Sequence, residues 1–351
     1  MFDEILSSYG LHPNHYKITP FGAGLINRTW KLSTQQGPCF ILQEINTTVF
    51  KQPADIADNI RNLGDYLQQH APGYLFAGAL PTQSGSDLYI DKNNRFFRLF
   101  KFIPDSHSID VVQSPKEAYE AARQFALFTK LLSGFDCGRL KITIPQFHDL
   151  SLRYRQFTEA LATGNSRRIK ESADLIQFLK EQEHLVHTFE AIKKDAGFRT
   201  RVIHHDTKIS NVLFDNHDKG LCVIDLDTVM PGYYISDVGD MMRTYLSPAS
   251  EEVKELDTIS VREEIFTAIA RGYLGELKNE LTETEKLHFV YSGKYMIYMQ
   301  ALRFLTDHLN DDRYYGAKYE GHNFMRAQNQ AVLLQKFTQQ EDLFNHIIST
   351  L

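Results

Sequence analysis

Apolar residues follow two different patterns along the chain. In the first hundred residues they gather in short runs typical of β-strands, at residues 16–20, 29–32, 39–45, 88–90 and 95–103. Between these runs, Ile56, Ile60, Leu63 and Leu67 recur at helical spacing behind Pro53, which suits the first turn of a helix. The pattern predicts a small antiparallel sheet that carries one helix over residues 53–69.

The pattern changes after residues 104–108, where a proline and several polar residues end the last strand. Ser114 and Glu117 form a capping-box signature with Pro115 at the first helical position, which predicts a helix as far as Leu132. Further helices are predicted at roughly 150–162, 168–194, 236–246, 251–277, 283–309 and 322–347. We therefore predict a two-lobed α+β fold, with a small antiparallel-sheet lobe at 1–104 and a larger, mostly helical lobe at 105–351.

A hairpin near the middle of the chain carries the densest group of chemically active side chains. Two short apolar runs, at 212–214 and 221–224, flank a polar turn and predict paired strands. Acids, a lysine and an amide lie just outside the two ends of this hairpin, and apolar strands rarely end in so many ionisable groups by accident. These residues are Asp206, Lys208 and Asn211 before the hairpin, and Asp225 and Asp227 after it.

The spacing of these residues indicates phosphoryl transfer. Asn211 follows Asp206 by five residues, which is the spacing of the kinase catalytic loop. Phosphoryl transfer requires a protein to position a hydroxyl, hold Mg²⁺ and spread phosphate charge, and a carboxylate, an ammonium and an amide on one loop can do this. The alternative is a simple β-hairpin with solvated acids at both ends.

A glycine-bearing turn, Phe21–Arg28, separates the first two predicted strands. Glycine needs no Cβ clearance, so backbone N–H groups at such a turn can approach a phosphate closely. A hairpin turn without any ligand is the alternative.

Composition restricts the class of protein. The chain has 351 residues, of which 42% are hydrophobic and 23% charged, as in an ordinary soluble globular protein long enough for two lobes. A net charge of −6 without a basic cluster argues against nucleic acid as a partner. Three widely spaced cysteines indicate a reducing compartment. Because we find neither a signal peptide nor a membrane-spanning run, we expect a cytoplasmic protein without a membrane partner. No protein partner is evident from the sequence.

The arrangement of motifs resembles the aminoglycoside phosphotransferase and choline kinase superfamily, which has a protein-kinase-like fold. The resemblance covers nearly the whole chain. Its specific parts are the motifs at 205–211, 224–228 and 236–240, and the stretches 225–232 and 301–307 bring it nearest to the N-acetylhexosamine 1-kinases.

The resemblance implies roles for the residues around the hairpin. Asp206 would be the catalytic base, and Lys208 would lie on the phosphate being transferred. Asn211 and Asp225 would hold Mg²⁺ through oxygen ligands, with ATP oxygens completing the octahedron. Asp227 would reach either a second metal or the hydroxyls of the substrate.

The resemblance also implies a nucleotide site in the first lobe, with Phe102 and Ile103 as a hinge that contacts adenine. The pair is equally natural as the end of a buried strand. Gln43 stands on the third strand where the family usually has a lysine that pairs with the α- and β-phosphates, so the charge would have to come from Lys31 or Lys208. The predicted nucleotide-binding residues are Gly22, Gly24, Asn27, Gln43, Phe102 and Ile103.

For the acceptor, the resemblance implies contacts from Asp227, Arg303 and Tyr314; the alternative for Arg303 is an ordinary surface arginine. The leading hypothesis is an ATP- and Mg²⁺-dependent kinase that phosphorylates the anomeric hydroxyl of an N-acetylhexosamine. One alternative is a kinase of an aminoglycoside, choline or another sugar. A third hypothesis is a pseudokinase that binds nucleotide without turnover; it has only Gln43 in its favour, and the intact Asp206, Asn211 and Asp225 oppose it.

Overall fold

The computed structural model describes residues 2–22 and 26–351; Gly24 lies outside them. The chain divides into two units. The first contains residues 1–108, 131–145 and 211–231, and the second contains residues 109–130, 146–210 and 232–351. The hairpin residues 211–231 therefore belong with the N-terminal unit, whereas the predicted division after residue 104 places them in the second lobe.

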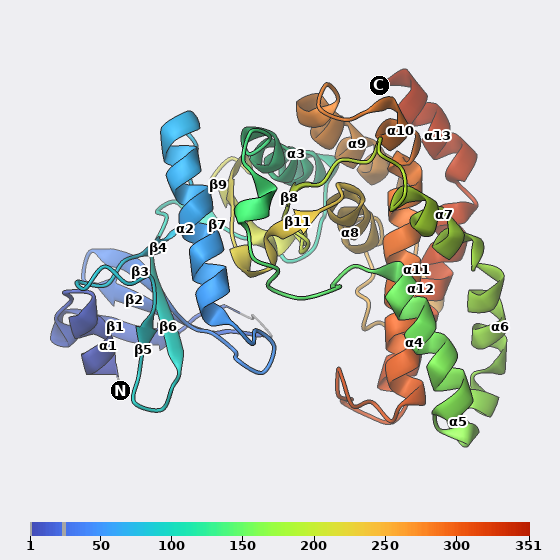
Figure 1. Cartoon of the computed structure of the whole chain (residues 1–351), viewed down its shortest axis with the longest axis horizontal. Coiled ribbons are helices and arrows are strands. Elements are labelled where there is room, and N and C mark those ends of the chain that lie inside the picture. The colour runs from blue at the N-terminus through green and yellow to red at the C-terminus, as the bar shows by residue number, and fades with distance from the viewer. Residues whose placement is uncertain (1, 23–25) are drawn as a thin grey trace. The chain divides into compact units, whose positions relative to one another are not determined.

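The first unit is built on an antiparallel sheet (Figure 1). Its strands are β1 (Lys17–Pro20), β2 (Arg28–Thr34), β3 (Gly37–Glu44), β4 (Ala79–Leu80), β5 (Tyr89–Ile90) and β6 (Phe96–Lys101). They lie in the order β1-β2-β3-β6-β4, with β5 also paired to β6. Alternate residues of these strands pack with Ile5 and Leu6 of helix α1 (Phe2–Ser8) into a core that includes Leu32, Leu42 and Phe97.

Helix α2 (Pro53–His70) buries the four apolar residues that predicted it. The hairpin strands β9 (Val212–Asp215) and β10 (Gly220–Val223) join β7 (Ser106–His107) in a second, three-stranded sheet. This pairing explains why the hairpin belongs to the first unit. The sequence prediction missed α1, β4 and β7, which are too short to show a period.

The second unit is mostly helical (Figure 1). Its long helix α11 (Phe289–Leu309) is buried on almost every side and packs against α4, α8 and α12. The other helices are α3 (Pro115–Leu131), α4 (Leu150–Thr163), α5 (Ser166–Glu171), α6 (Ala173–Glu181), α7 (His184–Ile192), α8 (Ile235–Tyr245), α9 (Glu263–Leu277), α10 (Glu283–Leu287), α12 (His322–Thr338) and α13 (Glu341–Thr350). Short strands β8 (Arg201–Ile203) and β11 (Met230–Gly232), and single 3₁₀ turns at 13–15, 137–139, 209–211, 226–228 and 256–258, complete the elements.

Four of the predicted helices are wrong in extent. The helix predicted over 322–347 is two helices, α12 and α13. The helix predicted over 168–194 is three helices, α5 to α7, and the one over 283–309 breaks at His288. The helix predicted from residue 251 begins only at Glu263. Its first part is drawn into tertiary contacts instead, because Glu251 and Glu252 form ion pairs with side chains of other segments.

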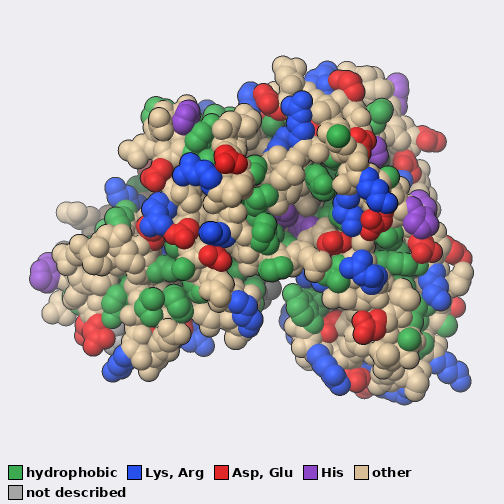
Figure 2. Space-filling model, in the orientation of Figure 1, with side chains coloured by type: hydrophobic (Ala, Val, Ile, Leu, Met, Phe, Trp, Pro, Cys, Tyr) green, Lys and Arg blue, Asp and Glu red, His purple; other side chains and the backbone are tan. Residues whose placement is uncertain are grey.

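Two features of the described surface and helices bear on the predicted partners. On the face shown in Figure 2, basic and acidic side chains lie interspersed rather than gathered by sign. Among the described helices, none combines the length and the apolar character needed to span a bilayer.

Candidate active site

The loop that carries Asp206 is held by two buried carboxylates of α8. Asp237 accepts hydrogen bonds from the backbone N–H groups of His204 (3.0 Å) and His205 (2.7 Å). Asp240 accepts from the N–H of Thr207 (2.9 Å). Thr207 is fixed further, since its hydroxyl donates to the Asp237 carbonyl and its own carbonyl accepts from the hydroxyl of Tyr245. The two acids therefore position the loop; neither caps α8, which has no side-chain cap.

The motif around these acids also explains a glycine. A Cβ at Gly239 would collide with the carbonyl oxygen of Ser292 and with Met296, so glycine lets α8 approach α11 closely. This close packing fixes the helix that presents Asp237 and Asp240. His205 adopts a left-handed backbone conformation with φ of 65°, a strained geometry that the surrounding hydrogen bonds stabilise.

Asp206 and Lys208 form an ion pair at the loop, with 3.2 Å between Nζ and Oδ1. A quarter of the Asp206 side chain and half of the Lys208 side chain are exposed. The carboxylate of Asp206 raises the pKa of the Lys208 ammonium, which therefore remains protonated at neutral pH. The predicted base and the predicted phosphate-binding cation thus lie side by side and reach solvent.

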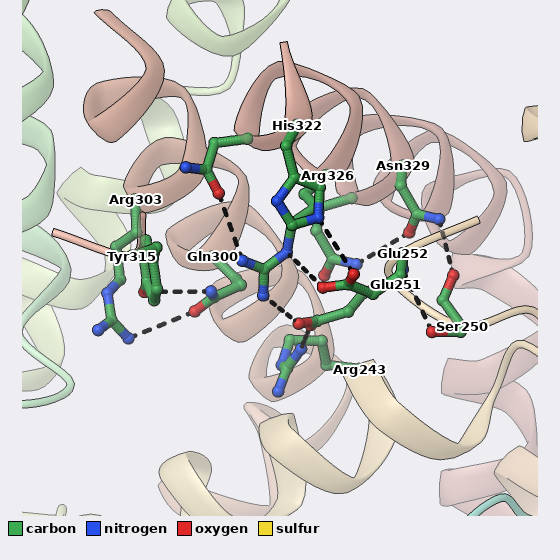
Figure 3. A network of polar contacts seen from close by, with 12 residues as sticks. Arg243, Ser250, Glu251, Glu252, Gln300, Arg303, Tyr315, His322, Arg326 and Asn329 are labelled. Carbon is green, nitrogen blue, oxygen red and sulfur yellow. Dashed lines mark hydrogen bonds and ion pairs between the residues drawn. The ribbon is translucent and has the colours of Figure 1, made fainter. Parts of the chain in front are cut away.

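A chain of ion pairs begins at Asp240, which binds the loop, and Figure 3 shows its part from Arg243 to Arg326 of α12. Arg243 donates to Asp240 (2.9 Å) and to Glu251 (2.7 Å). Arg326 donates to the second oxygen of Glu251 (2.5 Å), and its guanidinium lies 3.7 Å from the ring centre of Phe304. Each end of the Glu251 carboxylate therefore binds one guanidinium.

These charges shift pKa values in opposite directions. Burial would raise the pKa of Glu251, but Arg243 and Arg326 outweigh it and lower this pKa to about 2. Burial raises the pKa of Asp237 to about 7, although the two backbone N–H groups that donate to its carboxylate act to lower it. Burial also raises the pKa of Asp240, in opposition to Arg243.

Arg303 lies in a largely aromatic environment in the second unit. Its guanidinium lies 5.5–5.9 Å from the ring centres of Phe147, Tyr314 and Tyr315 and donates to the amide oxygen of Gln300 (3.3 Å; Figure 3). Within the described part of the chain, no carboxylate lies at ion-pair distance from Arg303. Tyr314 is 73% exposed, so its ring is available to a ligand.

A second arginine accompanies Arg303. Arg153 donates to the backbone carbonyls of Gln146 and Phe147 and, like Arg303, has no carboxylate partner among the residues described. Burial and the neighbouring Arg303 both lower its pKa. Ring contacts connect the two arginines to the loop. Phe147 stacks on His148, with 4.3 Å between the ring centres, and the ring of His148 lies tilted against that of His205, with 5.5 Å between the centres.

In the first unit, Gln43, Asn27 and Asp227 meet around a buried arginine. The Nε and Nη2 atoms of Arg98 donate to the amide oxygen of Gln43 (3.1 and 2.9 Å), and Nη1 pairs with Asp227 (2.5 Å). Asn27 donates to the other oxygen of Asp227 (2.8 Å) and accepts from the N–H of Asn46. Asp227 is 1% exposed with both oxygens engaged, so the predicted contact with substrate or a second metal would require it to release these partners.

Asn211 and Asp225 lie at one end of the hairpin. The N–H of Ile224 donates to the carbonyl of Asn211 (2.9 Å), which brings the backbone beside Asp225 next to Asn211. Asp225 adopts a left-handed conformation (φ 59°, ψ 61°), an uncommon geometry for a residue other than glycine. An amide and a carboxylate oxygen fit Mg²⁺, which typically takes one or two protein carboxylates and completes its shell with phosphates and water. Within the residues described, no cluster of three or more His, Cys, Asp or Glu side chains offers a metal site.

The other predicted nucleotide contacts give a mixed result. Gly22 has φ of 78°, which favours glycine, and no atom of the described residues beyond its chain neighbours lies within 4 Å of where a Cβ would stand. The predicted role of Gly24 concerns a residue outside the described part. The N–H of Phe102 donates to the carbonyl of Cys39, and the carbonyl of Ile103 accepts from Ser106, so the Phe102 amide continues the sheet and cannot serve adenine while that bond holds.

The structure adds residues that the sequence prediction missed. Arg98 could not be identified from the sequence because its partners lie 55 and 129 positions away. Arg243, Glu251 and Arg326 were missed because each looks like an ordinary charged residue on a helix surface. Arg153 gave no signal in the sequence. The missed residues are Arg98, Arg153, Arg243, Glu251, Gln300, Tyr315 and Arg326.

Comparison with known proteins identifies the family of the chain and structures that share its fold. The sequence model of the phosphotransferase enzyme family matches residues 17–273. An amicoumacin kinase in complex with AMP-PNP, Ca²⁺ and Ami is similar in structure, with a TM-score of 0.65 at 14% identity over 96% of this chain and 95% of that one. A microcompartment-associated aminopropanol kinase gives a TM-score of 0.66 at 15% identity over 97% and 98%. Choline kinase from Cryptosporidium parvum Iowa II gives 0.55 at 12% identity over 95% and 92%. These structures share the predicted two-lobed, protein-kinase-like α+β fold, which is thereby confirmed.

Proposed function

Because the chain belongs to the phosphotransferase enzyme family, we propose that it is an ATP- and Mg²⁺-dependent kinase that phosphorylates the anomeric hydroxyl of an N-acetylhexosamine. N-acetylglucosamine and N-acetylgalactosamine are the candidate acceptors. Support for nucleotide and a divalent cation comes from the amicoumacin kinase, whose structure contains AMP-PNP and Ca²⁺.

Asp206 is the base in this proposal. The sugar hydroxyl oxygen bonds to the γ-phosphorus while the bond from that phosphorus to the β,γ-bridging oxygen breaks, which releases ADP. The hydroxyl proton passes to the Asp206 carboxylate, which the loop holds in place and which remains exposed to solvent. Lys208 offers its protonated ammonium to the transferring phosphate. Asn211 and Asp225 would hold Mg²⁺, which would supply positive charge to the phosphates.

The observation that carries the choice of acceptor is the surface formed by Arg153, Arg303 and their aromatic neighbours. These two guanidinium groups, which have no carboxylate partner among the described side chains, repel a cationic acceptor such as choline or an aminoglycoside, by like-charge repulsion in a partly desolvated place. Guanidinium N–H groups are donors only, so they suit the hydroxyl and carbonyl oxygens of a neutral sugar. Tyrosine rings at the same place suit the apolar face of a pyranose.

The test is a panel of acceptors with ATP and Mg²⁺, read as ADP release. N-acetylglucosamine and N-acetylgalactosamine should stimulate release, whereas glucosamine, choline, aminopropanol and kanamycin should not. Arg303→Gln should raise the KM for an N-acetylhexosamine more than it lowers kcat. Release driven by the cationic acceptors and not by the N-acetylated sugars would refute the acceptor assignment, and an enzyme that binds ATP without any turnover would support the pseudokinase alternative.

A further inference from the structure

Strand β3 lacks a cation at the position of Gln43, but strand β6 supplies one directly beside it. Gln43 and Arg98 are opposite each other in the antiparallel register, so their side chains extend from the same face of the sheet. The two donated hydrogen bonds to the Gln43 oxygen fix the plane of the guanidinium. The charge that Gln43 cannot carry therefore lies one strand away.

Arg98 also links the two segments assigned to phosphate and metal. Its partner Asp227 lies two residues after Asp225, the proposed Mg²⁺ ligand, and Asp227 is bonded in turn to Asn27, which closes the glycine-bearing turn. A guanidinium has five N–H donors; two of them form hydrogen bonds with Gln43, and Nη1 forms an ion pair with Asp227. Because Arg98 is 2% exposed, phosphates can reach its remaining donors only when neighbouring side chains move aside. The planar arrangement of these donors matches phosphate oxygens better than an ammonium does.

We propose that Arg98 binds the phosphates of the nucleotide, and that Gln43 and Asp227 hold its guanidinium in the orientation for that contact. The proposal rests on the proposed function only in requiring a nucleotide. It makes Gln43 a positioning residue, which explains how a neutral amide can stand at this place. Lys31 is the alternative candidate for the cation that binds the phosphates. It extends from β2, and its Nζ lies 4.9 Å from the ring centre of Phe21, in the glycine-bearing turn.

The experiment measures, by calorimetry in the presence of Mg²⁺, the affinity of the full-length protein for adenosine, AMP, ADP and ATP. Loss of a hydrogen bond to a charged group typically costs about 10- to 100-fold in affinity, so Arg98→Met should weaken ATP and ADP by about that factor and leave adenosine within about twofold. Arg98→Lys keeps the charge but loses the planar donors, and should recover part of the loss. Arg95→Met, which removes an ion pair with Asp91 in the turn just before strand β6, is the matched control and should leave every affinity unchanged.

A purely structural arginine would give a different result. If either Arg98 variant weakens adenosine and ATP by the same factor, or leaves ATP unchanged, the proposal is wrong. It is also wrong if the increase in affinity from adenosine to ATP is lost in Lys31→Met and not in the Arg98 variants. Should Arg98→Met fail to fold, Arg98→Lys carries the same comparison. A wild-type protein that binds no nucleotide would overturn the proposed kinase function as well, whereas failure of the Arg98 variants alone leaves that function intact.

Discussion

Glu251→Gln tests whether the ion-pair chain between the loop that carries Asp206 and helix α12 stabilises the fold. In the wild type, each oxygen of Glu251 binds one guanidinium, from Arg243 and from Arg326. A carboxyl whose pKa falls from 4.5 to about 2 on folding contributes at most about 3 kcal/mol, and since 30% of the side chain is exposed, we expect a loss of about 2 kcal/mol. Both arginines keep a second carboxylate, Asp240 for one and Glu252 for the other, which limits the cost.

The pH dependence has a definite sign. A carboxyl with a lowered folded-state pKa stabilises fully above its unfolded value of 4.5 and loses this contribution as the pH falls toward about 2. The difference in free energy of unfolding between wild type and Glu251→Gln should therefore be largest at pH 7 and shrink below pH 4.5.

The assay is urea unfolding of both proteins at several pH values at which they still fold. Glu252→Gln is the matched control, because Glu252 is adjacent but more exposed and pairs mainly with Lys318 and His322; it should cost under about 1 kcal/mol. A Glu251→Gln loss below about 0.5 kcal/mol at pH 7, or one that does not shrink on acidification, would refute this account of the network.

Three further predictions concern the site. Asp206→Asn should lower kcat by about 10²- to 10⁴-fold while ATP affinity stays within a few-fold, and a variant that keeps more than about a tenth of kcat would show that Asp206 is not the base. Asp225→Ala should abolish the Mg²⁺ dependence of nucleotide binding in calorimetric titrations with and without metal; unchanged dependence would exclude it as a ligand. Gln43→Lys should leave kcat/KM for ATP unchanged or lower it, because the new ammonium would lie beside Arg98, and a large gain in steady-state kinetics would contradict the presence of a cation there already.

The parts of the site that sequence could predict are local in the chain. The order Asp206, Asn211 and Asp225 around a hairpin is visible because strand period, turn and polar residues lie within about two dozen positions. The sheet, α2 and most long helices follow from their apolar periods for the same reason. The sequence predicted the long helix α11 but not its start. The helical pattern runs on from α10 into α11, whereas the structure ends α10 and begins α11 on either side of His288.

What sequence could not predict depends on pairing between distant segments. The cation beside Gln43 is Arg98 rather than Lys31 or Lys208, because strand register decides which side chains are neighbours. Lys208 is already paired with Asp206. Glu251 was expected at the start of a helix, where a carboxylate is common, but two arginines from other helices hold it in an irregular segment.

The most direct test of the central claim is a ³¹P NMR spectrum of the products formed from ATP, Mg²⁺ and an N-acetylhexosamine. The account predicts a new phosphomonoester signal coupled to the anomeric proton of the sugar, formed in step with ADP by the wild type and nearly absent with Asp206→Asn. A phosphate on any other hydroxyl, no sugar phosphate at all with the wild type, or equal product from both proteins would contradict it.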